Sequence, residues 1–158
     1  MSEKKGLLPI PDQEAIKLAL LETGDSTEAY MDKQMTRLMK VNPWVGKNLA
    51  VLCENFESQG DELSANVVKY VGVSTYRILE LQAEREGKEL PKVGFEINNV
   101  IKRSSRSKGK YVSSIMNRLE EDNPPIYKRL QSIIDDLMPY GDSSAAACSS
   151  GVLVCWLL

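Results

Sequence analysis

The amino-acid sequence predicts an all-α fold, a single-domain irregular bundle of about six or seven helices with one long central helix. Apolar residues recur every three to four positions along most of the chain, which is the period of an amphipathic helix. No segment alternates apolar and polar residues convincingly, as a half-buried strand would. The 158 residues are 42% hydrophobic and 27% charged, values that are typical of one globular domain.

The first two helices are predicted from a stop signal and a start signal. Residues 12–23 form the first helix, and Gly24 suits the left-handed conformation that often ends a helix. The face that this helix should bury consists of Ile16, Ala19, Leu20 and Thr23. Asp25 and Glu28 have the spacing of a capping box, which indicates that the second helix begins there.

An asparagine–proline pair predicts the start of the third helix. Asn42 is a preferred cap and Pro43 a preferred first residue, and the helix should end at Gly60. The longest helix is predicted over residues 61–86, with an aspartate as its cap and an apolar stripe broad enough to contact neighbours on two sides. Gly72 in its middle indicates either a close helix crossing or a local break.

The last third of the chain is predicted to contain three shorter helices. Residues 95–103 suit a short helix better than a strand, and residues 104–109 suit a turn or loop. A clear apolar stripe predicts a helix over residues 110–121. The pair at 123–124 repeats the earlier asparagine–proline start, and the helix that follows it should end before Pro139.

Composition divides the chain into three parts. An N-terminal arm covers residues 1–11, a helical domain covers residues 12–139, and an apolar tail without a charge after Asp142 covers residues 140–158. The N-terminus lacks the apolar core of a signal peptide, and no apolar run is long enough to span a bilayer. Three cysteines are too few and too unevenly spaced for a disulfide framework. We therefore expect a cytoplasmic protein that does not insert into a membrane.

The sequence contains no histidine, which excludes several kinds of catalytic site. Without imidazole there is no Ser–His or Cys–His pair, no histidine-ligated zinc and no side chain whose unperturbed pKa lies near neutrality. The acidic residues at 120–122 and 135–136 diverge around their helices, so they do not present two carboxylates to one substrate. No phosphate-binding, dinucleotide-binding or calcium-binding motif is present. We expect a non-enzymatic protein without a cofactor or metal, and the sequence identifies no small-molecule substrate.

A basic segment lies within a chain whose net charge is only −2, because no acid occurs between Glu96 and Glu120. The densest part of the segment contains Lys102, Arg103, Arg106, Lys108 and Lys110. Such cations neutralise phosphates, which predicts salt-dependent binding of nucleic acid or another polyanion. The simpler interpretation is a solvated connection between helices, and a third is a regulatory phosphorylation site at the serines that follow the first two cations.

The tail supports a second functional hypothesis. Its last four residues match a C-a-a-X box, in which Cys155 would be prenylated and Cys148 would supply a second lipidation site. Trp156 is not aliphatic and no polybasic run precedes the box, which argues against a lipid-anchored peripheral membrane protein. The simpler interpretations are a tail packed in a groove of its own bundle or of a second subunit, a poorly ordered end, or a sequence artefact.

A row of three methionines at helical spacing lies on the predicted second helix. Such a stripe is more often core, although methionines are also common on adaptable binding surfaces. We expect the exposed part of this row and the apolar tail to form a protein interface. The predicted interface residues are Met31, Met35, Met39, Val152, Leu153, Trp156 and Leu157. The sequence therefore favours binding of a protein partner or self-association, with polyanion binding and lipid anchoring as alternatives.

Overall fold

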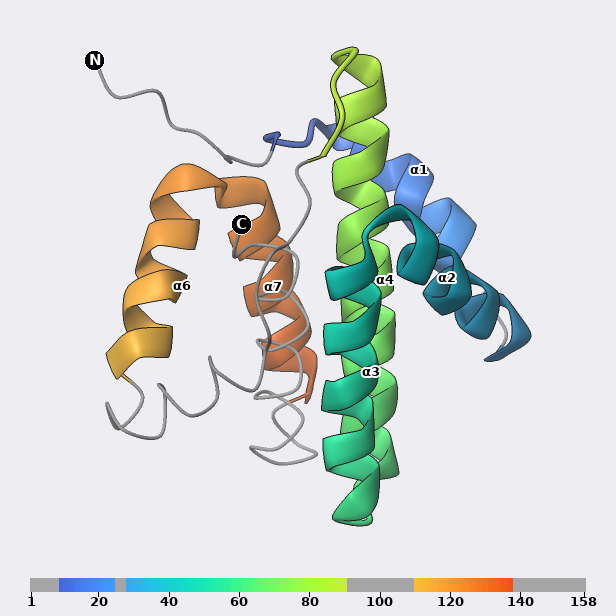
Figure 1. Ribbon diagram of the computed structural model, residues 1–158. Coiled ribbons are helices and arrows are strands. Elements are labelled where there is room, and N and C mark those ends of the chain that lie inside the picture. Colours follow the sequence, from blue (N-terminus) through green and yellow to red (C-terminus); the bar gives the residue numbers. More distant parts are fainter. Residues whose placement is uncertain (1–8, 25–27, 91–109, 138–158) are drawn as a thin grey trace.

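A computed structural model describes residues 9–24, 28–90 and 110–137 of the chain. Helix is the one regular secondary structure in these ranges. Six helices lie in these ranges without a strand, so the predicted all-α fold is confirmed (Figure 1). The helices are α1 (Gln13–Gly24), α2 (Glu28–Val41), α3 (Pro43–Ser58), α4 (Glu62–Arg85), α6 (Lys110–Asp122) and α7 (Pro124–Leu137). The helix predicted over residues 95–103 lies outside the described residues, as does the start of the predicted capping box at Asp25.

Helix α4 is the long central helix that the sequence predicts. Helices α1 and α2 lie on one side of it, α3 runs alongside it, and the hairpin of α6 and α7 lies on the other side (Figure 1). Because neighbours cover it on several sides, α4 buries Val68, Val71 and Ile78 completely. Helix α7 reaches it through Arg129, whose guanidinium donates hydrogen bonds of 2.8 Å to Ser74 Oγ and 3.3 Å to Thr75 Oγ1.

The glycine in the middle of α4 marks a close helix crossing, and α4 continues through it without a break. A Cβ atom on Gly72 would lie only 2.8 Å from Cδ1 of Leu49 on α3, well inside van der Waals contact. Glycine lowers the stability of a helix interior by about 1 kcal/mol relative to alanine. The close approach of α3 explains why a side chain is absent at this position, and it confirms the first of the two predicted interpretations.

Aspartates begin α4 and α1. Asp61 Oδ1 accepts a hydrogen bond of 3.1 Å from the Ser64 backbone N–H, and its Oδ2 accepts one of 2.6 Å from Ser64 Oγ. These bonds lower the pKa of the Asp61 carboxyl, and the predicted cap is confirmed. Asp12 Oδ1 accepts a hydrogen bond of 2.9 Å from the Ala15 backbone N–H in the same way.

The two asparagine–proline pairs start helices where predicted, but neither asparagine side chain acts as the cap. The Asn42 side chain makes no capping hydrogen bond, and its Nδ2 donates instead to Tyr76 OH on α4 at 3.3 Å. Asn123 Nδ2 donates to the carbonyl oxygen of Pro9 at 3.1 Å, and its Oδ1 accepts no hydrogen bond from the described residues. Both asparagines are fully buried, so their amides are used to join segments that are distant in sequence.

Candidate protein-binding surface

The predicted methionine row lies mostly inside the bundle. Met31 is only 8% exposed and belongs to the hydrophobic core, and Met35 packs against that core. Met39, near the end of α2, is 37% exposed. The core interpretation therefore holds for the first two methionines, and the interface prediction narrows to Met39 on this helix.

The other predicted site residues fall mainly outside the described residues. This applies to the basic residues Lys102, Arg103, Arg106 and Lys108, whereas Lys110 is the first residue of α6. It also applies to the predicted lipidation sites Cys148 and Cys155 and to the predicted tail interface of Val152, Leu153, Trp156 and Leu157. None of the helices within the described ranges is long and apolar enough to cross a membrane.

The described residues contain no cluster of three or more side chains suited to hold a metal ion. Cys53 is buried between α3 and α4, where its thiol donates a hydrogen bond of 3.4 Å to the carbonyl oxygen of Ala65. Desolvation raises the pKa of this thiol to about 11, so it stays protonated at neutral pH. A protonated and buried thiol is a poor nucleophile, and Cys53 is therefore a core residue.

Helix α1 buries a stripe of small side chains. Ala15, Ala19 and Thr23, four residues apart, are completely buried where α1 packs on α4. The Thr23 hydroxyl donates a hydrogen bond of 2.8 Å to the Ala19 carbonyl oxygen, which satisfies the one polar group among these three side chains. Small residues allow two helix backbones to approach closely, so α1 needs no large side chain to fill this contact.

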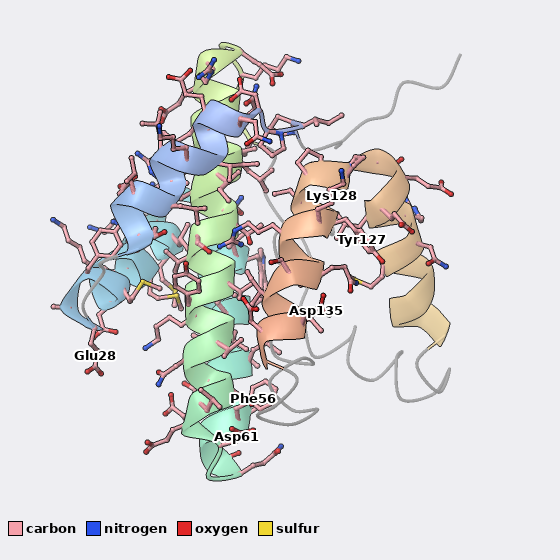
Figure 2. All side chains as sticks on the ribbon, turned by 180° about the vertical axis from the view of Figure 1, so that it is seen from behind. Glu28, Phe56, Asp61, Tyr127, Lys128 and Asp135 are labelled. Atoms are coloured by element: carbon pink, nitrogen blue, oxygen red, sulfur yellow. The ribbon has the colours of Figure 1, made fainter. Side chains whose placement is uncertain are left out.

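The outer side of α1 carries its leucines instead, whereas Ile16 is half-buried and packs against the core. Leu18 is 45% exposed, Leu20 is 36% exposed and Leu21 is 68% exposed. A shallow depression runs along this side of the helix, lined by the three leucines together with Gln13, Glu14, Ile16 and Lys17. Figure 2 shows α1, the blue helix, with side chains projecting away from α4. We call Leu18, Leu20 and Leu21 the outer leucines.

This arrangement partly corrects the predicted buried face of α1. Ala19 and Thr23 are buried as expected, Ile16 is half-buried, and Leu20 lies at the surface. A helix with apolar residues on almost every side is typical of a helix that is buried on every side. Within the described residues, the fold covers the side of α1 that carries Ala15, Ala19 and Thr23, and the outer leucines stay partly exposed.

Ion pairs fix how α1 lies on α4. Arg77 Nε on α4 lies 2.8 Å from Glu22 Oε2, and the guanidinium of Arg85 lies 3.1 Å from both Asp12 and Glu14. Partly exposed ion pairs of this kind contribute about 0.2–1 kcal/mol each. They therefore orient α1 more than they stabilise it. Among the described residues, Lys17 on the outer side of α1 has no ion-pair partner.

A second hollow lies between α2 and the first turns of α4. Its rim carries the carboxylates of Glu28, Glu57 and Glu62, and Met31 and Ala65 also line it. Glu28 lies at the start of α2, at the outer edge of the bundle in Figure 2. The nearby ammonium of Lys69 lies 3.5 Å from Asp32. Acidic residues near helix N-termini are stabilised by the helix dipole, which explains Glu28 and Glu62 without a ligand.

The outer leucines are thus a group of exposed apolar side chains on one helix, and Ile10, Met39, Val41 and Leu63 are further exposed apolar residues elsewhere in the described ranges. The apolar periodicity of the sequence does not predict that the outer leucines are exposed, because apolar residues on one helix are ordinarily assigned to its buried side. A useful signal is the spacing of Ala15, Ala19 and Thr23, which forms a stripe of small residues that can serve as the packing face. Comparisons with protein-family models, with curated proteins and with solved structures found no match to this chain.

Proposed function

We propose that this chain is a non-enzymatic, helical protein-binding or assembly protein, and that the outer leucines of α1 form its binding surface. The observation that carries the proposal is the reversal in α1, where alanines are buried and leucines are exposed. Exposed apolar residues that form one continuous patch are typical of protein–protein interaction sites. The proposal places the protein in a reducing, cytoplasmic setting, in keeping with the free thiol of Cys53.

Covering this surface gives a partner a hydrophobic gain. Complete burial of a leucine side chain is worth about 1.5–3 kcal/mol relative to full exposure. In the folded chain, from about a third to two-thirds of the surface of each outer leucine is exposed to solvent. A partner that covers all three leucines therefore gains part of this burial energy from each. A partner with its own apolar helix face or groove has the chemistry that fits this surface.

Site-specific photocross-linking in cells that naturally make the protein tests the proposal. A photoreactive phenylalanine analogue replaces Leu21, and the same analogue replaces Glu54, an exposed polar residue on α3, as the matched control. We expect position 21 to cross-link to a discrete polypeptide in high yield and position 54 to give little product. Equal and low yields at the two positions would show that the outer leucines are not a binding surface.

A further inference from the structure

The charges beside two of the outer leucines have a definite pattern. Leu18, Leu21 and Glu22 occupy the a, d and e positions of one heptad, and Lys17 occupies the g position of the heptad before it. Leucines at a and d form the seam between two paired helices, and charges at e and g flank that seam. Leu20 lies off this seam, one position before Leu21 and therefore about 100° around the helix from it.

We propose that the occupant of this surface is a second copy of the chain, whose α1 packs parallel to the first about a two-fold axis. The proposal rests on the proposed function, because it requires α1 to be a binding surface. In a parallel pair each leucine faces the same leucine of the other copy. The g position of one copy then faces the e position five residues further along the other copy, so Lys17 faces the partner's Glu22. Glu22 likewise faces the partner's Lys17, which gives a second ion pair.

The charge pattern favours the parallel pair over the antiparallel one. An antiparallel pair joins Leu18 to the partner's Leu21, which the apolar residues alone would allow. The antiparallel pair also places Lys17 beside the same lysine of the other copy and Glu22 beside the same glutamate, so that like charges flank the seam on both sides. Lys17 has no ion-pair partner among the described residues, and the parallel pair supplies one.

The structure also holds the complementary carboxylate in place. Glu22 is 36% exposed, and Arg77 on α4 binds it at 2.8 Å on the side of α1 next to α4. One turn before the leucine seam, Glu14 is bound by Arg85 at 3.1 Å, which offsets repulsion between the two copies at that end. The apolar contact is limited to one heptad. The interface is therefore small and the association weak, with a dissociation constant in the micromolar range or above.

Cysteine cross-linking tests the geometry directly. The native Cys148 and Cys155 are replaced by serine, which leaves the buried Cys53 as the native thiol, and Leu21→Cys is then introduced. Leu20→Cys is the matched control, an exposed leucine of the same helix that lies off the seam. We expect Leu21→Cys to form a covalent dimer under mild oxidation about tenfold faster than Leu20→Cys, because pairing raises the effective concentration of the thiol.

The orientation is tested with the same reagent. A mixture of Leu18→Cys and Leu21→Cys proteins that yields mainly the mixed disulfide would overturn the parallel arrangement. Circular dichroism verifies that each variant is folded, and analytical ultracentrifugation of the wild type at increasing concentration provides a readout without cysteine substitutions. A strict monomer in that experiment, with no preference for Leu21→Cys over Leu20→Cys, would overturn the second copy as the occupant.

Charge reversal tests the ion pairs. Lys17→Glu or Glu22→Lys alone should weaken self-association about fivefold, as expected for two pairs of about 0.5 kcal/mol each. A mixture of these two variants should prefer the heterodimer, because each copy then carries one sign of charge. Equal amounts of homodimer and heterodimer would contradict the assigned pairing. A Leu21 photocross-link to a different protein would overturn self-pairing while supporting the proposed function, whereas no cross-link at all would remove both.

Discussion

Helices α1 and α3 both pack on α4, but they do so with opposite kinds of residue. Helix α3 presents Leu49 and Leu52 to the core and leaves its charged side chains outside, although its Asn48 is also buried. Helix α1 presents alanines to α4 and leaves leucines outside. The same central helix therefore receives large apolar side chains from one neighbour and small ones from the other.

The difference separates two uses of apolar surface. Burial of large apolar side chains provides the hydrophobic stabilisation of a fold. Of the two helices, α3 therefore contributes more of this stabilisation than α1. The alanine contact of α1 buries less apolar area and relies on ion pairs for its orientation. The outer leucines of α1 stay partly exposed in one chain, so we infer that they are kept for another contact. Substitutions on the two helices can test this division.

The largest effect is expected from Leu49→Ala. Leu49 is completely buried, and truncation of such a leucine leaves a cavity that costs about 2–5 kcal/mol of unfolding free energy. Urea unfolding monitored by circular dichroism measures the loss. The matched variant Leu21→Ala should change the unfolding free energy by about 0.5 kcal/mol or less. Similar losses for the two variants would contradict the division between the helices.

The next effect is expected where α3 crosses α4. Gly72→Ala adds a methyl group in close contact with Leu49 and should destabilise the fold by about 1–3 kcal/mol. In the Leu49→Ala background the same substitution should cost much less, because the clashing side chain is absent. The four unfolding free energies of this double-mutant cycle give the coupling. Additive losses would show that the two residues are not in close contact.

A comparable effect is expected on the inner side of α1. Ala19→Leu places a large side chain where α1 meets α4 and should cost about 1–3 kcal/mol, because α1 must move away. Hydrogen exchange of the α1 amides measures whether the helix has loosened. The control is Leu20→Ala, which shortens an outer leucine and should leave the exchange rates of α1 unchanged. Protected α1 amides in Ala19→Leu would contradict the close packing.

A smaller effect depends on pH. Burial raises the pKa of Cys53 to about 11, above the ordinary thiol value of 9.0 that applies to the unfolded chain. The protonated thiol therefore contributes stability that is complete below pH 9.0 and is lost as the pH rises toward 11. At pH 10.5 the wild type should have lost about 2 kcal/mol more of its unfolding free energy than the Cys53→Ala variant has. Parallel pH profiles for the two proteins would contradict a buried, protonated thiol.

Much of the fold could be predicted from local sequence signals. The bounds of α4, α6 and α7, the Asp61 cap and the crossing at Gly72 follow from apolar period, capping chemistry and the cost of glycine in a helix. The roles of Asn42 and Asn123 could not be predicted in this way. Their hydrogen-bond partners, Tyr76 and Pro9, are distant in sequence, and tertiary contact overrides the local preference for capping.

The candidate binding surface was the hardest part to predict. Helix α1 is apolar on nearly all sides, so its pattern does not select one face as buried, and the size of Leu20 favours it as a core residue. Contact with α4 selects the small residues because it needs close backbone approach. The methionine row narrows to Met39 as a predicted interface residue for a related reason, because Met31 lies in the core.

The most direct test of the central claim is the double variant Leu18→Ser/Leu21→Ser, measured for both stability and association. If the outer leucines serve a partner more than the fold, its unfolding free energy should fall by no more than about 1–2 kcal/mol relative to the wild type at concentrations where both are monomeric. Its self-association in analytical ultracentrifugation should be lost at the same time. A variant that loses several kcal/mol of stability, or that associates as the wild type does, would contradict the claim.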